Sequence, residues 1–325
     1  MKHLAIATGL LAASTAAADT PVLTVYTYDS FIAEWGPGPA VEKAFEETCG
    51  CDLQFVAAGD GAALLSRLRL EGDRTEADIV LGLDTSLIGA ARDTGLFAPV
   101  TVEAEYALPI PWQDPEFVPY DWSYFAFVGR KDGPTPDSFR ALADSGASVV
   151  IQDPRSSTPG LGLLMWVKTA YGDEAAEIWE GLADNIVTVT PGWSEAYGLF
   201  VDGEADLVLS YTTSPAYHLI AEDDDGKMAL PFEEGHYMQV EVAAKVASTD
   251  VPDLADSFLQ FMVTDPFQSV IPTTNWMYPA VEPEGGLPEG FMTLIQPAIP
   301  LLATPEEAQA VRDAALEEWR SALSR

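Results

Sequence analysis

Short apolar runs of strand length alternate with stretches of helical spacing in the first third of the chain. In the second helical stretch, Leu64, Leu65 and Leu68 recur at the spacing that places side chains on one helix face. Alternating strands and helices indicate right-handed crossovers and a parallel sheet. The predicted strands are residues 21–28, 53–57 and 77–83, and the predicted helices are residues 40–48, 62–71 and 87–94.

A second strand and helix series follows a proline-rich connector. The aromatic run at residues 120–128 is predicted to be a strand that crosses between two α/β lobes, and the alternating residues 237–247 are predicted to carry the chain back. The last helix should begin at Thr304, where Glu307 completes a capping box. The other predicted strands are residues 149–151, 186–189 and 206–211, and the other helices are residues 138–143, 174–184, 194–202, 252–263 and 266–270.

Residues 148–166 contain a strand-to-helix turn that is a candidate binding loop. A buried strand leads into a loop at residues 152–160, and an apolar helix follows from Leu161. The hydroxyls of Ser156, Ser157 and Thr158 can cap this helix, so that free N–H groups and the positive end of the helix dipole face one spot. The pattern suits an anion or a polar ligand, although taken alone it more often marks an ordinary capped helix.

Polar and aromatic residues gather where the predicted strands end. Ligands of parallel sheets bind beyond the carboxyl ends of the strands, and these ends place Tyr28, Trp35, Asp60, Gly61 and Asp84 along one rim. Aromatic residues at strand ends of both lobes indicate a shared cleft for a flat ring or a cation, which gains roughly 0.5–2 kcal/mol over an aromatic face. These residues are Tyr28, Trp35, Trp193, Tyr211, Tyr217, Trp276 and Tyr278.

Residues 1–18 have the pattern of a bacterial secretory signal. Lys2 and His3 give a basic start, residues 4–11 form an apolar run, and a small-residue cleavage site precedes Asp19. The run is too short to span a bilayer, and no later stretch reaches the roughly 20 apolar residues that a spanning helix needs. We therefore expect a protein exported to the periplasm without a membrane anchor.

The composition is strongly acidic. The chain has 325 residues, 16 Lys and Arg against 51 Asp and Glu, and a formal net charge of -35. Nucleic acid and anionic membranes are poor partners for such a field, whereas a cationic ligand would be attracted. We interpret the acidity mainly as a solvated surface, and the length suits one large or two mid-sized domains.

The two cysteines, Cys49 and Cys51, lie between a predicted helix and a predicted strand. In an oxidising compartment they can form a disulfide, but the ring is small and so is its entropic benefit. Two thiols alone do not make a metal site. We interpret the pair as a local staple and predict no metal site.

Motifs of exported or nucleotide-dependent enzymes are absent from the sequence. After the signal sequence the histidines are His218 and His236, and no G-x-S-x-G elbow accompanies them. A Walker loop and a dinucleotide-binding glycine pattern are also missing. We therefore interpret both histidines as structural and predict that the protein is not an enzyme.

Six motifs carry a resemblance to a known family. They are VLTVYTYDSF at residues 22–31, WGPGP at 35–39, QDPRSSTPG at 152–160, GWSEAYGLF at 192–200, LSYTTSPAY at 209–217 and NWMYP at 275–279. Together they closely resemble the thiamine-binding periplasmic proteins of bacterial thiamine ABC transporters. The likeness runs from about residue 21 to the C-terminus, and departs from the family at Ala58 and Gly59, which replace bulkier residues, and in its more acidic surface.

The resemblance implies an α/β, two-lobed type II periplasmic-binding-protein fold with the ligand in the interlobe cleft. Residues 19–124 and 237–325 would form the first lobe, and residues 125–236 the second. The implied function is non-enzymatic: the protein captures thiamine, and thiamine monophosphate and diphosphate, and delivers it to an inner-membrane ABC permease. No cofactor is implied, and we expect a monomer.

The resemblance also carries ligand positions onto this chain. Asp60 and Gly61 fall on the ligand loop of the first lobe, and Ser157 and Thr158 on the donor loop of the second. We expect the aminopyrimidine to stack on aromatic rings and bond to Asp60, the thiazolium to make cation–π contacts, and the hydroxyethyl or phosphate end to meet the donor loop. The other implied ligand positions are Tyr28, Trp35, Trp193, Tyr211, Thr212, Thr213, Ser214, Tyr217 and Trp276.

Two alternatives stay open at this point. One is a ferric-iron or polyamine receptor of the same fold, although iron sites of that group use clustered tyrosines and no adjacent Tyr-Tyr pair occurs here. The other is a secreted thiamine-phosphate hydrolase. No serine has the sequence context of a nucleophile, which disfavours this second alternative.

Overall fold

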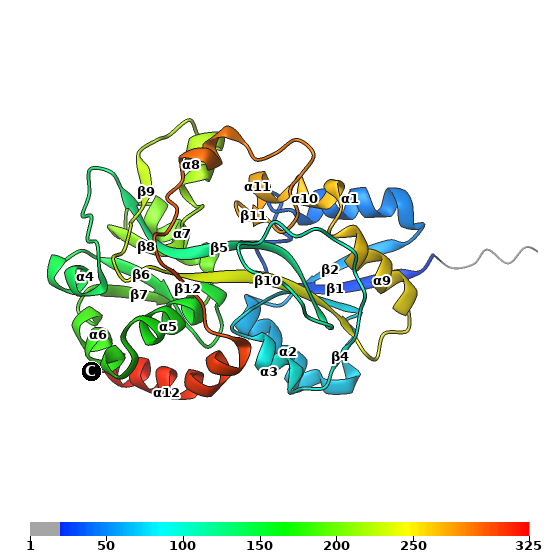
Figure 1. Ribbon diagram of the computed structural model, residues 1–325, viewed down its shortest axis with the longest axis horizontal. Coiled ribbons are helices and arrows are strands. Elements are labelled where there is room, and N and C mark those ends of the chain that lie inside the picture. The colour runs from blue at the N-terminus through cyan, green and yellow to red at the C-terminus, as the bar shows by residue number, and fades with distance from the viewer. Residues whose placement is uncertain (1–19, 325) are drawn as a thin grey trace, which may run out of the picture.

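The computed structural model describes residues 20–324, in which two α/β lobes share two long central strands (Figure 1). In the first lobe, parallel strands lie in the order β2-β1-β3, as the alternating pattern predicts. These strands are β1 (Val22–Thr27), β2 (Asp52–Ala57) and β3 (Ile79–Asp84), and the helices between and after them are α1 (Gly38–Cys49), α2 (Gly61–Glu71) and α3 (Ile88–Arg92).

The two central strands are β5 (Phe117–Arg130) and β10 (His236–Val246), which confirms the predicted crossings between the lobes. They pair with each other in antiparallel fashion; β10 also pairs with β3 and β5 with β8 of the second lobe. The expected parallel sheet is therefore mixed, because the crossing strands run against their neighbours. The second lobe adds β6 (Val149–Gln152), β7 (Ile186–Thr190) and β8 (Leu207–Tyr211), and the order is β2-β1-β3-β10-β5-β8-β6-β7.

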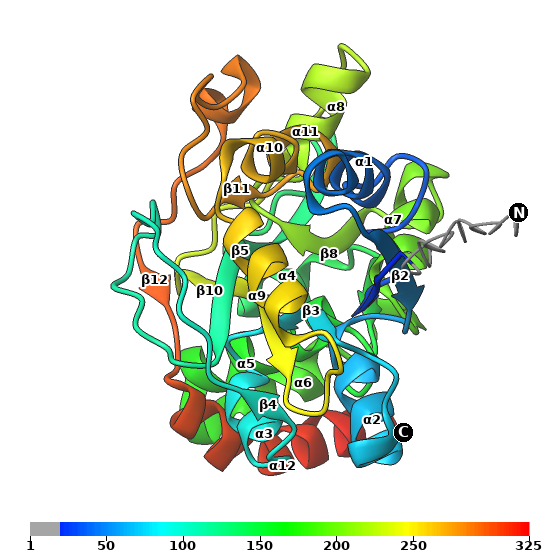
Figure 2. The same cartoon turned by 90° about the vertical axis from the view of Figure 1, so that its right-hand side faces the viewer.

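Helices cover the strands from both sides. Figure 2 shows α1 and α10 above the strands and α2, α3 and α12 below them. The second lobe has helices α4 (Phe139–Ser145), α5 (Thr158–Tyr171), α6 (Ala175–Leu182), α7 (Trp193–Val201) and α8 (Pro215–Ala221). After β10 follow α9 (Pro252–Phe261), α10 (Asp265–Gln268), α11 (Ile271–Thr274) and α12 (Pro305–Leu323). Short strands are β4 (Phe97–Ala98), β9 (Lys227–Ala229), β11 (Tyr278–Pro279) and β12 (Pro300–Leu301).

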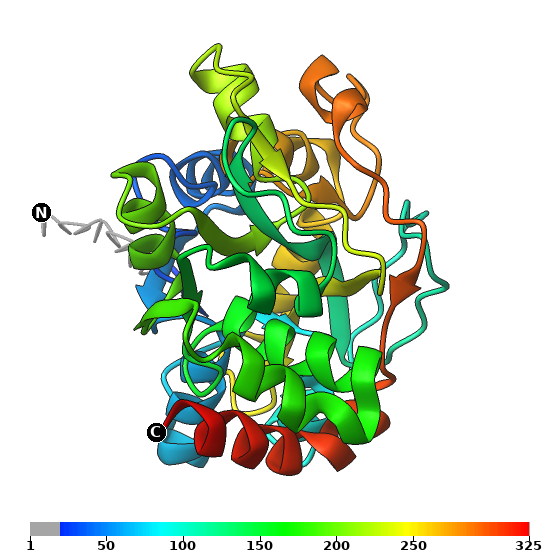
Figure 3. The same cartoon turned by 90° about the vertical axis from the view of Figure 1, so that its left-hand side faces the viewer.

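The C-terminal helix begins as predicted, but it packs on a different lobe. Thr304 and Glu307 form the capping box, with Glu307 N donating to Thr304 Oγ1 over 3.2 Å. Helix α12 packs mainly on α5 and α6 and also reaches α3 (Figure 3). The sequence grouped this helix with the first lobe. Its spacing shows an apolar face, which includes Trp319, but not which surface that face covers.

Two further expectations concern the ends of elements. Cys49 and Cys51 form a disulfide where α1 turns into β2, as the local staple requires. The predicted signal sequence at residues 1–18 lies outside the described residues. Within residues 20–324, none of the helices combines the length and the apolar character that a membrane crossing requires.

The contact between α5 and β5 depends on a glycine. A Cβ added to Gly162 would lie 2.0 Å from the ring of Phe125, which is itself fully buried. Helix α5 can therefore approach the central strand only where this side chain is missing. The site residues at the start of α5 take their position from the same contact.

We predict that Gly162→Ala destabilises the protein by roughly 1–3 kcal/mol, because an added methyl group overpacks the interior. Urea unfolding followed by circular dichroism measures the change. Gly198→Ala in α7 is the control, since a Cβ there meets open space and alanine is the better helix former by about 1 kcal/mol. Equal midpoints for Gly162→Ala and the wild type would contradict the close approach.

Candidate functional site

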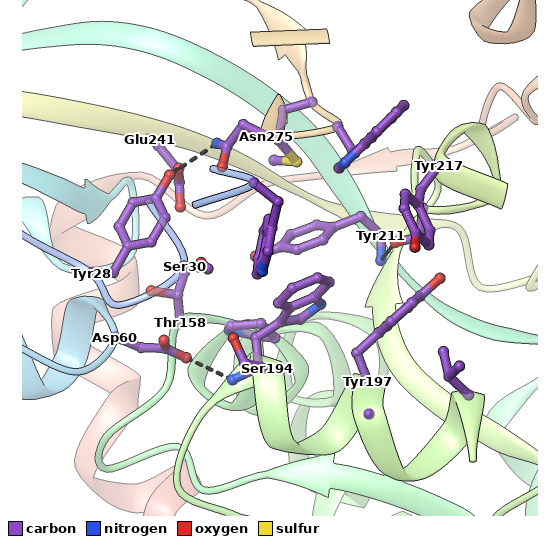
Figure 4. A pocket seen from close by; sticks show the side chains of 18 of the residues that line it. Tyr28, Ser30, Asp60, Thr158, Ser194, Tyr197, Tyr211, Tyr217, Glu241 and Asn275 are labelled. Carbon is purple, nitrogen blue, oxygen red and sulfur yellow. Dashed lines mark hydrogen bonds between the residues drawn. The ribbon is translucent and has the colours of Figure 1, made fainter. Parts of the chain in front are cut away.

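A cavity of about 530 Å³ lies between the two lobes (Figure 4). Nine of the predicted site residues line it, and they come from both lobes. The nine residues are Tyr28, Trp35, Asp60, Thr158, Trp193, Tyr211, Ser214, Tyr217 and Trp276.

Four predicted ligand positions do not line the cavity and lie behind its wall. Gly61 and Ser157 contact the opposite lobe directly. The hydroxyls of Thr212 and Thr213 are buried and share the hydroxyl of Ser123, at 3.3 and 3.1 Å. These four residues support the residues that line the cavity. The sequence could not show which of the predicted positions line the cavity and which lie behind them.

The lobes touch each other through Asp60. Its Oδ2 accepts hydrogen bonds from Ser157 Oγ at 2.7 Å and from the backbone N–H of Trp193 at 3.1 Å. Beside it, Gly61 N donates to Thr158 Oγ1 over 3.1 Å. A Cβ at Gly61 would lie 2.6 Å from that same Thr158 oxygen, so this approach requires glycine. The lobes therefore meet on one side of the cavity through three polar side chains and two backbone N–H groups.

The predicted helix cap is not made. Ser157 is the N-cap residue of α5, but its side chain makes no capping hydrogen bond. Its hydroxyl donates to Asp60, and the hydroxyl of Ser156 donates to Pro191 O over 2.6 Å. The helix also begins at Thr158, three residues before the predicted Leu161. Both serine hydroxyls are therefore oriented by partners outside the helix.

Aromatic rings form much of the remaining wall. Trp193 stacks on Tyr197 with ring centroids 5.0 Å apart, and Trp35 of the first lobe approaches Trp193 at 6.3 Å. Tyr217 and Trp276 pack edge to face at 5.3 Å. Figure 4 shows Tyr197 and Tyr217 on the same side of the cavity. Flat ligands and cations are the chemistry that such rings bind.

Trp276 is held in an unusual backbone conformation. Its φ of 56° lies in the left-handed region, which costs a residue with a side chain about 1–3 kcal/mol. The surrounding packing includes Tyr217, and Trp276 N donates to Ile271 O over 3.0 Å. The packing around Trp276 therefore fixes the direction of the indole at the cavity wall.

Two acidic side chains line the cavity without a cation beside them. Burial raises the pKa of Asp60 to about 6, against the opposing effect of its hydrogen bonds from Ser157 and Trp193. Glu241 on β10 is buried, and its Oε2 accepts from Tyr28 Oη at 3.0 Å and Tyr120 Oη at 2.6 Å. The described residues that line the cavity include no Lys, Arg or His. A cationic ligand would therefore meet two acids and no competing protein charge.

Several lining residues were missed by the sequence analysis. Tyr197 and Asn275 stand inside the motifs quoted above, so the resemblance could have supplied them. Glu241 lies in the alternating strand that was used only to trace the chain. An acid in a strand that is otherwise buried was the available signal. The others include Ser30, Thr273 and Met277.

Asp84, which was expected on the rim, and Tyr278, which was expected among the aromatic residues of the cleft, lie elsewhere. Asp84 is fully buried below the cavity, where its Oδ1 accepts from Leu87 N over 3.1 Å. Tyr278 stacks on Trp122 at 4.6 Å and does not line the cavity. Strand ends predict a sheet edge, but they do not show which side chains turn inward.

Both histidines have structural partners, as the sequence analysis predicted. His236 Nδ1 donates to Phe125 O over 2.8 Å, and its Nε2 accepts from Phe232 N. His218 lies between Tyr197 Oη at 2.9 Å and Glu222 Oε2 at 2.6 Å. With Asp224 it forms a group whose ligand atoms lie within 4.8 Å of one another. Hydrogen bonds already satisfy these atoms, so the arrangement needs no metal ion.

Residues 24–272 match the family of bacterial extracellular solute-binding proteins. The chain belongs to this family. This solute-binding protein is 55% identical over 311 residues to the thiamine-binding periplasmic protein of Escherichia coli K12, which covers 94% of each chain. A solved structure described as a periplasmic thiamin binding protein superposes with a TM-score of 0.91 at 55% identity, covering 94% of this chain and 97% of that one. The iron uptake protein A1 of Synechocystis is more distant, at 27% identity over 244 residues, 69% of this chain and 67% of its own.

These comparisons confirm the predicted family resemblance, the two-lobed fold and the class of non-enzymatic binding proteins. The roles of individual side chains toward a ligand stay predictions. The geometry shows that aromatic rings and acids line the cavity, and that the lobes touch at its edge through Asp60 and Gly61.

We predict that Asp60→Asn shifts the ligand-free solute-binding protein toward an open form. The substitution removes a charged acceptor of two hydrogen bonds, each worth roughly 1.5–3 kcal/mol. Small-angle X-ray scattering would then show a larger radius of gyration. Asp29→Asn is the control, because Asp29 accepts from Gly59 within one lobe. Identical curves for Asp60→Asn and wild type would contradict the role of this contact.

Proposed function

We propose that this solute-binding protein captures thiamine in the periplasm and delivers it to an inner-membrane ABC permease. The observation that carries the proposal is a cavity lined by aromatic rings and two acids, with no cationic side chain among the described residues around it. Thiamine joins an aromatic aminopyrimidine to a permanently cationic thiazolium, and this cavity complements both. Relatives at 55% identity whose names state thiamine binding support the same ligand.

The aminopyrimidine has a natural place beside Asp60. The carboxylate can accept from the exocyclic amine, and the stacked pair of Trp193 and Tyr197 offers a face for the ring. The thiazolium then gains cation–π contact from the rings on the same wall, among them Tyr217 and Trp276. In this arrangement no further cofactor takes part, and a single chain is sufficient.

The tail of the ligand is assigned to the start of α5. Thr158 lines the cavity there, and the first N–H groups of this 14-residue helix provide donors without a positive side chain. Thiamine monophosphate and diphosphate are therefore included in the proposal. Ser157 contributes indirectly, because its hydroxyl already donates to Asp60.

Binding closes the lobes because the ligand touches both of them. A ligand shifts a two-state equilibrium by its differential affinity for the two states. Asp60 belongs to the first lobe and Trp193 to the second, and both line the cavity. The closed form is then the form that a permease recognises.

No specific observation favours an iron site or a hydrolase. The hydroxyls of Tyr28, Tyr197 and Tyr217 are each engaged with a neighbouring side chain instead of converging on one point. Ser214 and Ser210 share a 2.7 Å hydrogen bond, and neither contacts a histidine in the hydrogen bonds described. Both alternatives nevertheless make useful controls.

We predict that the mature protein binds thiamine with a Kd of about 1 µM or lower, equivalent to about 8 kcal/mol or more. Isothermal titration calorimetry gives the affinity, and tryptophan fluorescence should change as the rings are covered. Ferric citrate and spermidine should give no saturable heat, and thiamine monophosphate should release no free phosphate. Saturable iron or spermidine binding in the absence of thiamine binding would overturn the proposal.

We predict that Ser157→Ala combined with Thr158→Ala weakens thiamine monophosphate at least about tenfold more than thiamine. A charged tail loses hydrogen bonds worth roughly 1.5–3 kcal/mol each, whereas the rings keep their contacts. Competition titrations against both ligands measure the two losses. Ser156→Ala is the matched control in the same loop, since its hydroxyl donates to Pro191 O. Equal losses for the two ligands would mean that the loop does not hold the tail.

A further inference from the structure

A second carboxyl group lies beside Glu241, which lines the cavity, on the neighbouring strand. Asp121 of β5 is the register partner of Glu241 of β10, and both side chains are buried. The two carboxyl groups are close enough to share a hydrogen bond. Asp121 Oδ2 accepts from Asn275 Nδ2 over 2.6 Å, but Oδ1 finds no donor. An acceptor without a donor at this depth is satisfied when the carboxyl group carries its own proton.

An irregularity in the strands creates this arrangement. The pairing of β5 with β10 slips between Glu241 and Val242, so Tyr120 is an extra residue on β5 next to Asp121. Tyr120 and Asp121 can therefore both turn to the same carboxyl group. Pro119, which cannot donate to the ladder, stands at the same point. Bulges of this type are frequent beside binding sites, where they redirect side chains.

Further carboxyl groups and tyrosine hydroxyls surround the Asp121–Glu241 pair. Asp84 of β3 lies opposite Glu241 on its other side, and Asp60 at the start of α2 raises the pKa of Glu241 further. The phenols that face the pair are Tyr28, Tyr120 and Tyr211. Lys245 on the same strand is engaged by Asp256 at 2.5 Å.

Two ionised carboxylates are unfavourable in these surroundings. Burial is the main cause that raises the pKa of Asp121 well above its usual range and the pKa of Glu241 into the neutral range. Repulsion between the two acids adds to the effect on Asp121. With the cavity empty, the pair therefore holds more than one proton for part of the neutral pH range.

We propose that the Asp121–Glu241 pair is the counter-charge for the cation of the ligand, and that binding of the cation expels one proton from the pair. This inference rests on the proposed thiamine-binding function. The cation replaces the proton: the Glu241 O–H bond breaks, its electron pair stays on the carboxylate, and the proton passes to solvent. Asp121 keeps its proton and donates to Glu241, so the pair carries one negative charge opposite the one positive charge of the ligand.

The sign of the pH dependence follows from this exchange. Below neutral pH the cation must displace a bound proton, so the affinity for thiamine is lower. As the pH rises through the range in which Glu241 ionises, affinity increases by at most tenfold per pH unit and then levels off. A neutral ligand of the same shape gains nothing from the ionised pair.

Calorimetry in two buffers of different ionisation enthalpy tests the exchange. At pH 7 the wild type should release between about 0.3 and 1 proton per thiamine. Glu241→Gln should bind thiamine on the order of 10- to 100-fold more weakly and release no proton. Asp121→Asn keeps a neutral hydrogen-bond donor beside Glu241, so it should retain the proton release, because Glu241 is the source of the proton. Deazathiamine, in which a neutral thiophene replaces the thiazolium, should bind the wild type without proton release.

The outcomes separate this inference from the proposed function. Asp60→Asn is the comparison: it should weaken thiamine and reduce the proton release without abolishing it, because Asp60 raises the pKa of Glu241 but is not the source of the proton. Thiamine binding without buffer-dependent heat at pH 6, 7 and 8 overturns the inference and leaves the proposed function standing. Release that survives in Glu241→Gln also overturns it, because another group would be the source. Absence of thiamine binding by the wild type overturns both.

Discussion

The pairing of β5 with β10 is the interaction on which the rest of the structure depends. The two strands are buried over most of their length and run through both lobes, so they join the lobes and carry the cavity floor at once. One slip in their register places Tyr120, Asp121 and Glu241 together. The same backbone pairing thus connects the two lobes and brings two carboxyl groups together.

Much of the fold follows from the sequence because short apolar runs and helical spacing are local signals. The strands of both lobes, the two crossings and the capped start of α12 were all predicted from such patterns. The lobe on which α12 packs could not be predicted, because an amphipathic face does not identify its partner. The antiparallel direction of β5 and β10 depends on how the chain returns, which spacing alone does not contain.

The residues of the candidate site also fall into those that the sequence could predict and those that it could not. Aromatic residues after strands and the family resemblance gave nine residues that line the cavity, among them Asp60 and Trp193. The hydroxyl of Ser157 was assigned to a helix end, but the structure directs it to a carboxylate of the other lobe, to which it donates. Glu241 was missed because a polar residue in an alternating strand is normally expected to face solvent. Its burial depends on β3 and β5 on either side.

The cavity combines rigid and adjustable parts. The aromatic wall is held by packing and, at Trp276, by a strained backbone, so its shape selects ligands without rearrangement. The acids respond to what enters, because their charge depends on the charge beside them. The shape of the aromatic wall would therefore set which ligands fit, and the charge of the acids would set the affinity for a ligand that fits.

The close contact at Gly61 bears on how the permease would distinguish a loaded protein from an empty one. The lobes meet there across a space too small for a single carbon atom, between Gly82 O and Thr158 Oγ1. Any side chain at this position would act as a wedge outside the cavity, leaving the rings and acids intact while keeping the lobes apart. Ligand could then occupy the cavity without the lobes closing. In this protein both events occur together only because residue 61 has no side chain.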